Sequence, residues 1–226
     1  MLLLISIALG APLGPTGLLR PGLEVAGFVS SGHTWLRETS CDAERCDAWR
    51  QDTVYGGEVG VGVLPWLGFY AHGGWVQESI DAAFYDANGY AFGGGGRANV
   101  PLGELAGLHA WVGLENQLTY APADNERAAM WSVEAGGQLR GGRPDEGIQV
   151  WVGGAVVPWS SQNAEFLGGD VKVSLAPRVP VTGELGGMWT SDPLFGPWDD
   201  RTRLSAGFIG TVGYRAGVTG FLGVVY

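Results

Sequence analysis

The final stretch of the chain, residues 204–226, constrains its fold more than any other. Every second residue from Leu204 onward is apolar or glycine, whereas the residues between them include Ser205, Arg215 and Thr219. A period of two over this length predicts β-structure with one apolar face. A chain that stops on this pattern leaves its apolar face without a protein cover. We therefore expect lipid to cover it.

The same stretch resembles the C-terminal strand of bacterial outer-membrane β-barrel proteins, in which alternating apolar residues lead to a terminal aromatic residue. The residues that match this pattern here are Val218, Leu222, Val224 and Tyr226. The resemblance implies that they close a barrel and are recognised by the barrel-insertion machinery. It implies a bacterial outer-membrane location and extends to the broad class of small barrels of the OmpA, OmpX and OmpW type, without a specific subfamily.

The composition agrees with a sheet rather than a helical protein. A chain of 226 residues without a low-complexity linker is expected to form one domain. Its 40 Gly and 10 Trp are unusual for a helical enzyme, because helix interiors disfavour glycine, whereas curved sheets tolerate glycine and membrane interfaces favour Trp. The net charge of −10, without a cluster of Lys and Arg, argues against a nucleic-acid partner.

Two short segments indicate whether the chain is secreted and in which cellular compartment it folds. Residues 1–11 form an apolar run that is too short to span a bilayer as a helix and resembles the core of a secretory signal peptide. We expect residues 1–20 to be a signal peptide or a disordered N-terminus, and residues 21–226 to form the barrel. Cys41 and Cys46 either form a disulfide, which implies an oxidising compartment, or remain two free thiols in a loop.

From residue 21 onward, runs of alternating residues are separated by turns and loops, with no helical segment between them. The expected strands are 23–36, 53–64, 67–80, 90–100, 108–120, 129–140, 148–157, 165–175, 179–190 and 204–226. Consecutive hairpins of this kind predict an all-β fold, namely a transmembrane antiparallel meander β-barrel. We expect ten strands, with eight or twelve as alternatives, and a turn at residues 214–217 would split the last strand in two.

The chemistry of the two strand faces distinguishes a membrane barrel from a soluble one. In a soluble fold the polar face meets water and is rich in Lys, Glu and Thr. Here it is mainly Gly, Ser, Thr and Gln with isolated charges of both signs, which suits a crowded lumen where buried charges must pair. His72 and His109 are expected to face this lumen. The charges expected there are Glu58, Glu78, Arg97, Glu115, Glu134, Arg140, Asp170, Lys172, Glu184, Arg203 and Arg215.

The same strand assignment places the longer loops on one side of the membrane, as is usual for such barrels. These loops are 37–52, 81–89, 121–128, 158–163 and 191–201. An aromatic girdle is expected on that side. Its members are Trp35, Tyr120, Trp131, Trp159 and Trp189. The acidic residues of these loops either form a solvated surface or bridge through divalent ions to lipopolysaccharide.

The sequence offers little for catalysis. A lipid A deacylase or phospholipase needs a serine activated by an oriented histidine, and we find no His-x-Ser arrangement. The remaining candidate is His33 with Ser30, Ser31 and Glu38. No metal-ligand spacing or phosphate loop is present, so we expect no enzyme, metal or cofactor.

Two non-enzymatic functions remain. The first is a barrel that supports the envelope or presents loops, and the second is a narrow channel for small solutes or ions with a charge-paired lumen. Inward glycines favour open volume, whereas Trp111, Trp151 and Phe166 would partly fill it. The alternative is an outer-membrane lipid-modifying enzyme of the lipid A deacylase or phospholipase type. We expect a monomer whose partners are outer-membrane lipid, lipopolysaccharide and the insertion machinery.

Overall fold

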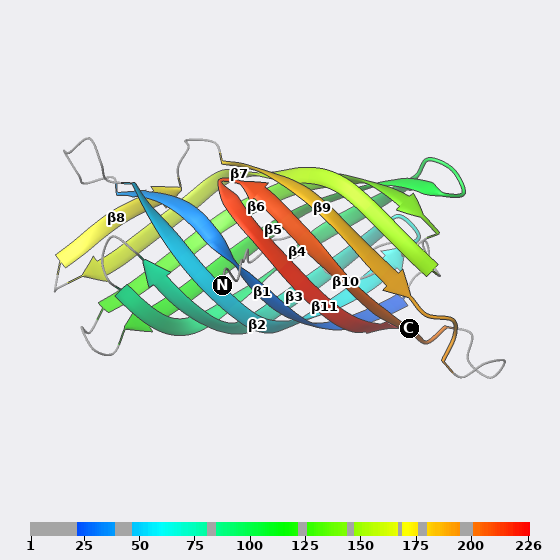
Figure 1. Ribbon diagram of the computed structural model, residues 1–226, viewed down its shortest axis with the longest axis horizontal. Coiled ribbons are helices and arrows are strands. Elements are labelled where there is room, and N and C mark those ends of the chain that lie inside the picture. Colours follow the sequence, from blue (N-terminus) through cyan, green and yellow to red (C-terminus); the bar gives the residue numbers. More distant parts are fainter. Residues whose placement is uncertain are drawn as a thin grey trace.

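The computed structural model describes residues 22–38, 47–80, 85–121, 126–143, 147–166, 169–175, 180–194 and 201–226. These residues form one antiparallel sheet that closes on itself, because the first strand pairs with the last (Figure 1). The strands are β1 (Gly22–Glu38), β2 (Asp47–Leu64), β3 (Leu67–Ile80), β4 (Tyr85–Pro101), β5 (Ala106–Ala121), β6 (Glu126–Gly142), β7 (Gly147–Phe166), β8 (Gly169–Leu175), β9 (Val181–Thr190), β10 (Arg203–Gly213) and β11 (Arg215–Val225).

Two of these segments, β8 and β9, belong to one strand of the barrel. Both run antiparallel to β7: β8 pairs with residues 162–166 of β7, and β9 pairs with residues 147–156. Counted together, they give a closed ten-stranded antiparallel meander in the part of the chain that the structure describes. The predicted fold class and strand number are therefore confirmed.

The barrel narrows along its axis. At the end where β1 begins and β11 ends, called the terminal end below, Leu23 and Tyr226 exchange backbone hydrogen bonds of 2.8 Å. There the wall contains β1 to β7 together with β9, β10 and β11, which makes ten strands. At the opposite end, called the far end, β8 pairs directly with residues 36–38 of β1, so the wall contains only the eight strands β1 to β8. Figure 1 shows β8 at the far end, away from the C-terminus.

The change from ten strands to eight occurs at the tip of the β10–β11 hairpin. Gly213 has a φ of 132°, which only glycine adopts readily, and the chain reverses there. The next residue, Tyr214, donates a backbone hydrogen bond to the Val181 carbonyl (3.2 Å) and accepts one from the Trp35 amide (3.0 Å). The tip is therefore bonded to the start of β9 on one side and to the last residues of β1, near the far end, on the other.

This turn corrects the expectation that residues 204–226 form one long strand. The strand count still holds because residues 169–175 and 181–190, expected in two strands (165–175 and 179–190), belong to one strand of the barrel. The expected loop 158–163 was also wrong, because these residues are part of β7. Pro158 suggested a turn there. It lies instead at a β-bulge, where the register between β6 and β7 shifts near Val133, and a bulge accommodates a residue without a backbone N–H.

The side assigned to one connection was also wrong. Because β9 runs toward the terminal end, the described residues that follow β9 and precede β10, 191–194 and 201–202, lie at that end, whereas the loop 191–201 was expected on the far side. Trp189 lies at this end as well. The other loops expected on the far side were predicted too long, because residues 37–38, 47–52, 85–89, 121 and 126–128 belong to strands. Residues 39–46, 81–84 and 122–125, the segment 1–20, and Cys41 and Cys46 lie outside the described residues.

The outer surface is apolar across the middle of the barrel and aromatic toward both ends. Along the strands whose side-chain exposure the structure describes, exposed Val, Leu and Ala side chains alternate with buried ones, many of them polar. Exposed aromatic side chains toward the far end are Trp35, Trp49, Trp75, Tyr90, Tyr120, Trp131 and Trp159, and those toward the terminal end are Trp66, Phe69, Trp189 and Tyr226. Among the described residues, no helix is long and apolar enough to cross a membrane.

Replacing Gly213 with alanine tests the hairpin tip. The added Cβ would overlap the Val181 carbonyl and would hold φ at an unfavourable value, so we expect destabilisation on the order of 1–3 kcal/mol. Gly220 on β11 is the matched control, because its Cβ would meet nothing within 4 Å. Urea unfolding in lipid vesicles measures both variants. Equal stability of the two would contradict the strained tip.

Candidate functional site in the barrel lumen

The polar side chains that alternate with the apolar surface are packed inside the barrel. Of the residues predicted to line the lumen, the ones that the structure shows as buried are Glu58, Glu78, Arg97, His109, Glu115, Glu134, Arg140, Glu184 and Arg215. The side chain of His72 is also nearly covered, at 5% exposed. Arg203 is only half-buried and donates to the Ser191 carbonyl (3.3 Å) at the terminal end. The side chains of Asp170 and Lys172 lie outside the described residues.

Near the terminal end, an ion pair crosses part of the lumen. Arg97 on β4 donates to the Glu24 carboxylate on β1 at 2.5 Å, and two strands separate them in the wall. Beside this pair, Arg140 donates twice to the Gln138 side-chain oxygen (3.0 and 2.6 Å), and Gln138 donates to Glu184 (2.9 Å). The Arg140 guanidinium also lies over the Trp151 ring, at 5.0 Å from its centroid. We call these residues the terminal layer.

A second set of contacts occupies the middle of the lumen. The His72 ring nitrogen Nε2 lies 2.7 Å from the Glu115 carboxylate. The same ring stacks on Tyr70, with centroids 6.2 Å apart, and meets the edge of Phe28. A histidine between a carboxylate and two aromatic rings is held in one orientation by the packing around it.

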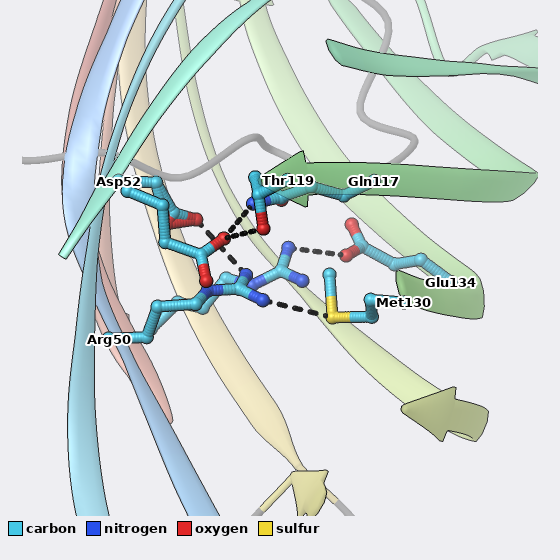
Figure 2. Close-up of polar contacts among 8 residues, drawn as sticks. Arg50, Asp52, Gln117, Thr119, Met130 and Glu134 are labelled. Atoms are coloured by element: carbon cyan, nitrogen blue, oxygen red, sulfur yellow. Dashed lines mark hydrogen bonds and ion pairs between the residues drawn. The ribbon is translucent and has the colours of Figure 1, made fainter. Parts of the chain in front are cut away.

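A third layer, the far layer, lies toward the far end and is drawn in Figure 2. Its contacts join side chains from strands that are not neighbours in the sheet. Arg215 on β11 donates to the Glu134 carboxylate on β6 (3.2 Å), and Arg50 on β2 donates to the Met130 sulfur, also on β6 (3.3 Å). In each case three strands of the wall lie between the partners, so these side chains meet across the lumen.

The carboxylates of the far layer are also hydrogen-bonded. Asp52 accepts from Arg50 at 3.0 Å. Glu78 accepts from Gln117 (2.6 Å) and from Thr119 (3.4 Å). Buried carboxylates that accept hydrogen bonds from cations and amides avoid much of the cost of burial. The layer therefore contains three separate groups of hydrogen-bonded side chains (Figure 2).

Glycines on the inner face make room for these large side chains. A Cβ at Gly93 would overlap the Glu115 carboxylate, and a Cβ at Gly136 would overlap the Trp111 ring. Gly186 stands in the same relation to the Trp151 ring. The expectation that inward glycines leave open volume was therefore wrong at these positions. Each glycine lies beside a bulky residue of another strand, which fills the space.

The sequence reasoning missed part of the lumen. Glu24 lies between the outward Leu23 and Val25, so strict alternation along β1 was the signal that would have found it. Arg50 and Asp52 were placed in a loop, although β2 already begins at Asp47. An apolar cluster inside the barrel was also missed apart from Trp151, which was expected to face the lumen; its members are Phe28, Val54, Val76, Ala91, Met130, Trp151, Met188, Ile209 and Phe221.

The packed lumen leaves little space for water. Side chains that lined a water-filled channel would remain exposed to it, whereas Arg97, His109, Glu115 and Gln138 are each at most 2% exposed. Among the described residues, no group of three or more His, Cys, Asp or Glu side chains is arranged to hold a metal ion. The distribution of charges inside and apolar residues outside is the reverse of a soluble protein. It defines a transmembrane β-barrel.

Comparison with known proteins adds no family. No family model and no curated protein matches the chain. Among solved structures, the translocator domain of the autotransporter NalP from Neisseria meningitidis aligns with 91% of this chain and 88% of its own, at 14% identity and a TM-score of 0.45. A loop-deletion mutant of the outer-membrane protein OmpT of Vibrio cholerae aligns with 88% of this chain and 75% of its own, at 11% identity and a TM-score of 0.32.

The Pseudomonas putida toluene transporter TodX covers 95% of this chain and 89% of its own, at 8% identity and a TM-score of 0.30. At such low identities and TM-scores, these likenesses assign neither a substrate nor an activity to the chain. The functional argument below therefore uses only the geometry of the barrel itself.

Replacing Arg97 with methionine tests the pairing of buried charges. The substitution leaves the Glu24 carboxylate buried without its cation, which should destabilise the barrel by about 3–5 kcal/mol. The double variant Glu24→Gln/Arg97→Met removes both charges and should recover much of that loss. The free energy of unfolding of the wild type and of both variants is measured with urea in lipid vesicles. A double variant as unstable as the single one would show that the pairing of charges is not what Arg97 contributes.

Proposed function

We propose that the chain is an integral β-barrel of the bacterial outer membrane that serves as a closed scaffold for the envelope, and not as an open pore. The observation that carries this proposal is the contact of side chains across the lumen, such as Arg215 with Glu134 and Arg50 with Met130. A pore of useful width requires these residues to be separated by water. Here they are within hydrogen-bonding distance.

The outer surface supports the membrane location. Exposed apolar side chains near the middle of the strands, such as Val112 and Leu185, would be costly in water over so large an area. Aromatic residues flank this band toward both ends, as they do at the two interfaces of a bilayer. On β11 the side chains of Val218, Leu222, Val224 and Tyr226 are exposed on the outer face. They are available to lipid and to the insertion machinery that we expect to recognise them.

A catalytic function has less support. The His33 ring meets the edge of Trp49, with centroids 6.1 Å apart. The two nearby serines are engaged elsewhere, because Ser30 is hydrogen-bonded to Thr219 (2.8 Å) and Ser31 to Thr53 (3.3 Å). No activated serine is therefore evident at the remaining candidate site in the described residues. We propose a monomeric, non-enzymatic barrel without a cofactor, whose partners are outer-membrane lipid and lipopolysaccharide.

Ion conductance of the refolded protein in a planar lipid bilayer tests the closed lumen. We expect no discrete current steps from the wild-type protein, because charged side chains of the described strands fill the space that hydrated ions would need. Folding is verified separately by the heat-dependent mobility of the barrel in gel electrophoresis. Reproducible steps from the folded protein would favour the narrow channel over the closed scaffold.

An arginine at Val112 tests the lipid-facing band. Val112 is exposed near the middle of β5, and a charge at the bilayer midplane should cost about 2–4 kcal/mol. The matched control is Leu105→Arg, in the turn between β4 and β5, where the same charge should cost at most about 1 kcal/mol. Folding stability in vesicles distinguishes the two positions. Equal costs would mean that the band does not face lipid.

A further inference from the structure

We propose that an outward-facing polar patch near the far end of β1 to β4 binds the saccharide headgroup of lipid A, the membrane anchor of lipopolysaccharide. This inference rests on the proposed function, in which the barrel lies in the outer membrane and has lipopolysaccharide as a partner. It goes further by naming the place of contact. The patch is called the outer polar patch below, and its members are Ser31, His33, Gln51, Thr53, Gln77 and Asn88.

The pairing of four neighbouring strands brings most of these residues into one row (Figure 1). Ser31 on β1 pairs with Thr53 on β2, which pairs with Gln77 on β3. Asn88 on β4 pairs with Gln77 and completes the row. Neighbouring strands are about 4.8 Å apart, so the row extends roughly 14 Å around the barrel. A headgroup of two sugar rings presents polar groups over a comparable width.

The patch lies on the outer face, because its members share the parity of exposed residues on their strands. On β1, His33 has the same parity as the exposed Val29 and Trp35. On β2, Gln51 is paired with His33 and has the same parity as the exposed Trp49. His33 and Gln51 therefore form a second polar row, beside the first one on its far side.

Aromatic side chains border the patch along two sides. Toward the middle of the barrel, the next outward row contains Tyr55, Trp75 and Tyr90, and the last two rings meet edge to face with centroids 5.2 Å apart. Toward the far end, the rings of Trp35 and Trp49 also lie 5.2 Å apart. Exposed aromatic residues of membrane proteins gather at the level of the lipid headgroups. A patch between two such rows lies at that level and not in bulk water.

The turns of the barrel indicate which leaflet the patch meets. The connections 65–66 and 102–105 lie at the terminal end and are short. Short turns are typical of the periplasmic side of outer-membrane barrels, so the far end faces outward. The patch therefore meets the outer leaflet, whose characteristic lipid is lipopolysaccharide.

The patch carries hydrogen-bonding groups that the barrel does not use. Within the described residues, the ring nitrogens of His33 have no hydrogen-bonding partner. The same holds for the side-chain amides of Gln51, Gln77 and Asn88. Gln77 and Asn88 are exposed, and the other two are half-buried. These four side chains are available to a ligand at the surface.

Asn116 shows how the barrel covers an outward amide that lies outside the patch. It has the same parity as the exposed Leu114 on β5, yet it is only 1% exposed. Its amide donates to the Met130 carbonyl (3.2 Å). In the register it lies between Phe92 and Trp131, whose rings meet edge to face. The amides of the outer polar patch lack this cover, which distinguishes a binding surface from a packed one.

The chemistry of the patch favours a neutral ligand. Its side chains are hydroxyls, carboxamides and one imidazole, without Lys, Arg, Asp or Glu. Such groups both donate and accept hydrogen bonds, which matches sugar hydroxyls and the amide and ester carbonyls of lipid A. Phosphates are bound chiefly by arginine and lysine. The patch is also continuous with the lipid-covered band, so the acyl chains of the bound lipid would extend over Val29 and Tyr55.

The test is binding of lipid A to the folded full-length chain in detergent, measured by native mass spectrometry. We expect one lipid A per wild-type barrel and about tenfold weaker binding by Thr53→Val/Gln77→Leu, because the variant loses two hydrogen-bonding groups. Both substitutions place apolar side chains on a surface that is apolar elsewhere. The matched control is Ser161→Val, which removes an exposed hydroxyl opposite Trp131, outside the patch, and should bind as the wild type does.

Three results would overturn the site or separate it from the scaffold. Equal binding by the folded patch variant and the wild type would reduce the patch to a solvated surface. Lipid A without its phosphates should bind nearly as well, and loss of binding on dephosphorylation would contradict saccharide recognition. A barrel that is silent in planar bilayers but binds no lipid A overturns the patch alone, whereas a barrel that conducts and binds lipid A overturns only the closed scaffold.

A second measurement uses the wild-type protein, so that it remains decisive if the patch variant does not fold. Diethyl pyrocarbonate modifies accessible imidazoles. His33 is half-exposed on the outer face, whereas the side chains of His72 and His109 are nearly covered. Modification of His33 in phosphatidylcholine vesicles should slow several-fold when lipid A is included, as followed by peptide mass spectrometry. An unchanged rate would contradict the site.

Discussion

The rest of this structure depends on one constraint: a backbone in lipid has no water to bond with, so every N–H and C=O must find a protein partner. A sheet meets this requirement only if it closes, and here β1 pairs with β11 along residues 24–34. Closure dictates the alternation that runs through the chain, with lipid on one side and a confined lumen on the other. The need for closure also explains why the tip of the β10–β11 hairpin is hydrogen-bonded to strands on both sides, since unpaired backbone groups there would be costly.

A closed sheet of ten strands encloses a narrow space, and the chain fills it with charge. Arginine and glutamate from separate strands meet across the lumen, as in Arg215 with Glu134 and Arg97 with Glu24, and these contacts tie the strands together. Each ion pair reduces the cost of burying its two charges, and each large side chain also needs room to lie in. Glycine provides that room: Gly136 faces the Trp111 ring and Gly93 faces the Glu115 carboxylate. Glycines at these positions are thus part of the packing of the lumen.

Most of the fold could be predicted from the sequence, because alternation is a local property and lipid imposes it on every strand. The strand boundaries were less accessible: Pro158 suggested a turn but lies at a bulge, and a turn was considered at residues 214–217 and set aside, whereas the chain turns at Gly213. The inward charges followed from parity, as Glu115 and Arg97 illustrate. Which partner each charge meets could not be predicted, since contacts such as Arg215 with Glu134 depend on the tilt and closure of the barrel.

The most direct test of the account is a spin-label scan along β5, residues 108–118, in lipid vesicles, with Cys41 and Cys46 replaced by serine. The account predicts that labels at outward positions such as Leu108 and Val112 collide freely with oxygen dissolved in the lipid. Labels at inward positions such as His109 and Gly113 should be shielded from both oxygen and a water-soluble nickel complex. Inward labels that are accessible to the nickel complex along the strand would show a water-filled lumen and contradict the account.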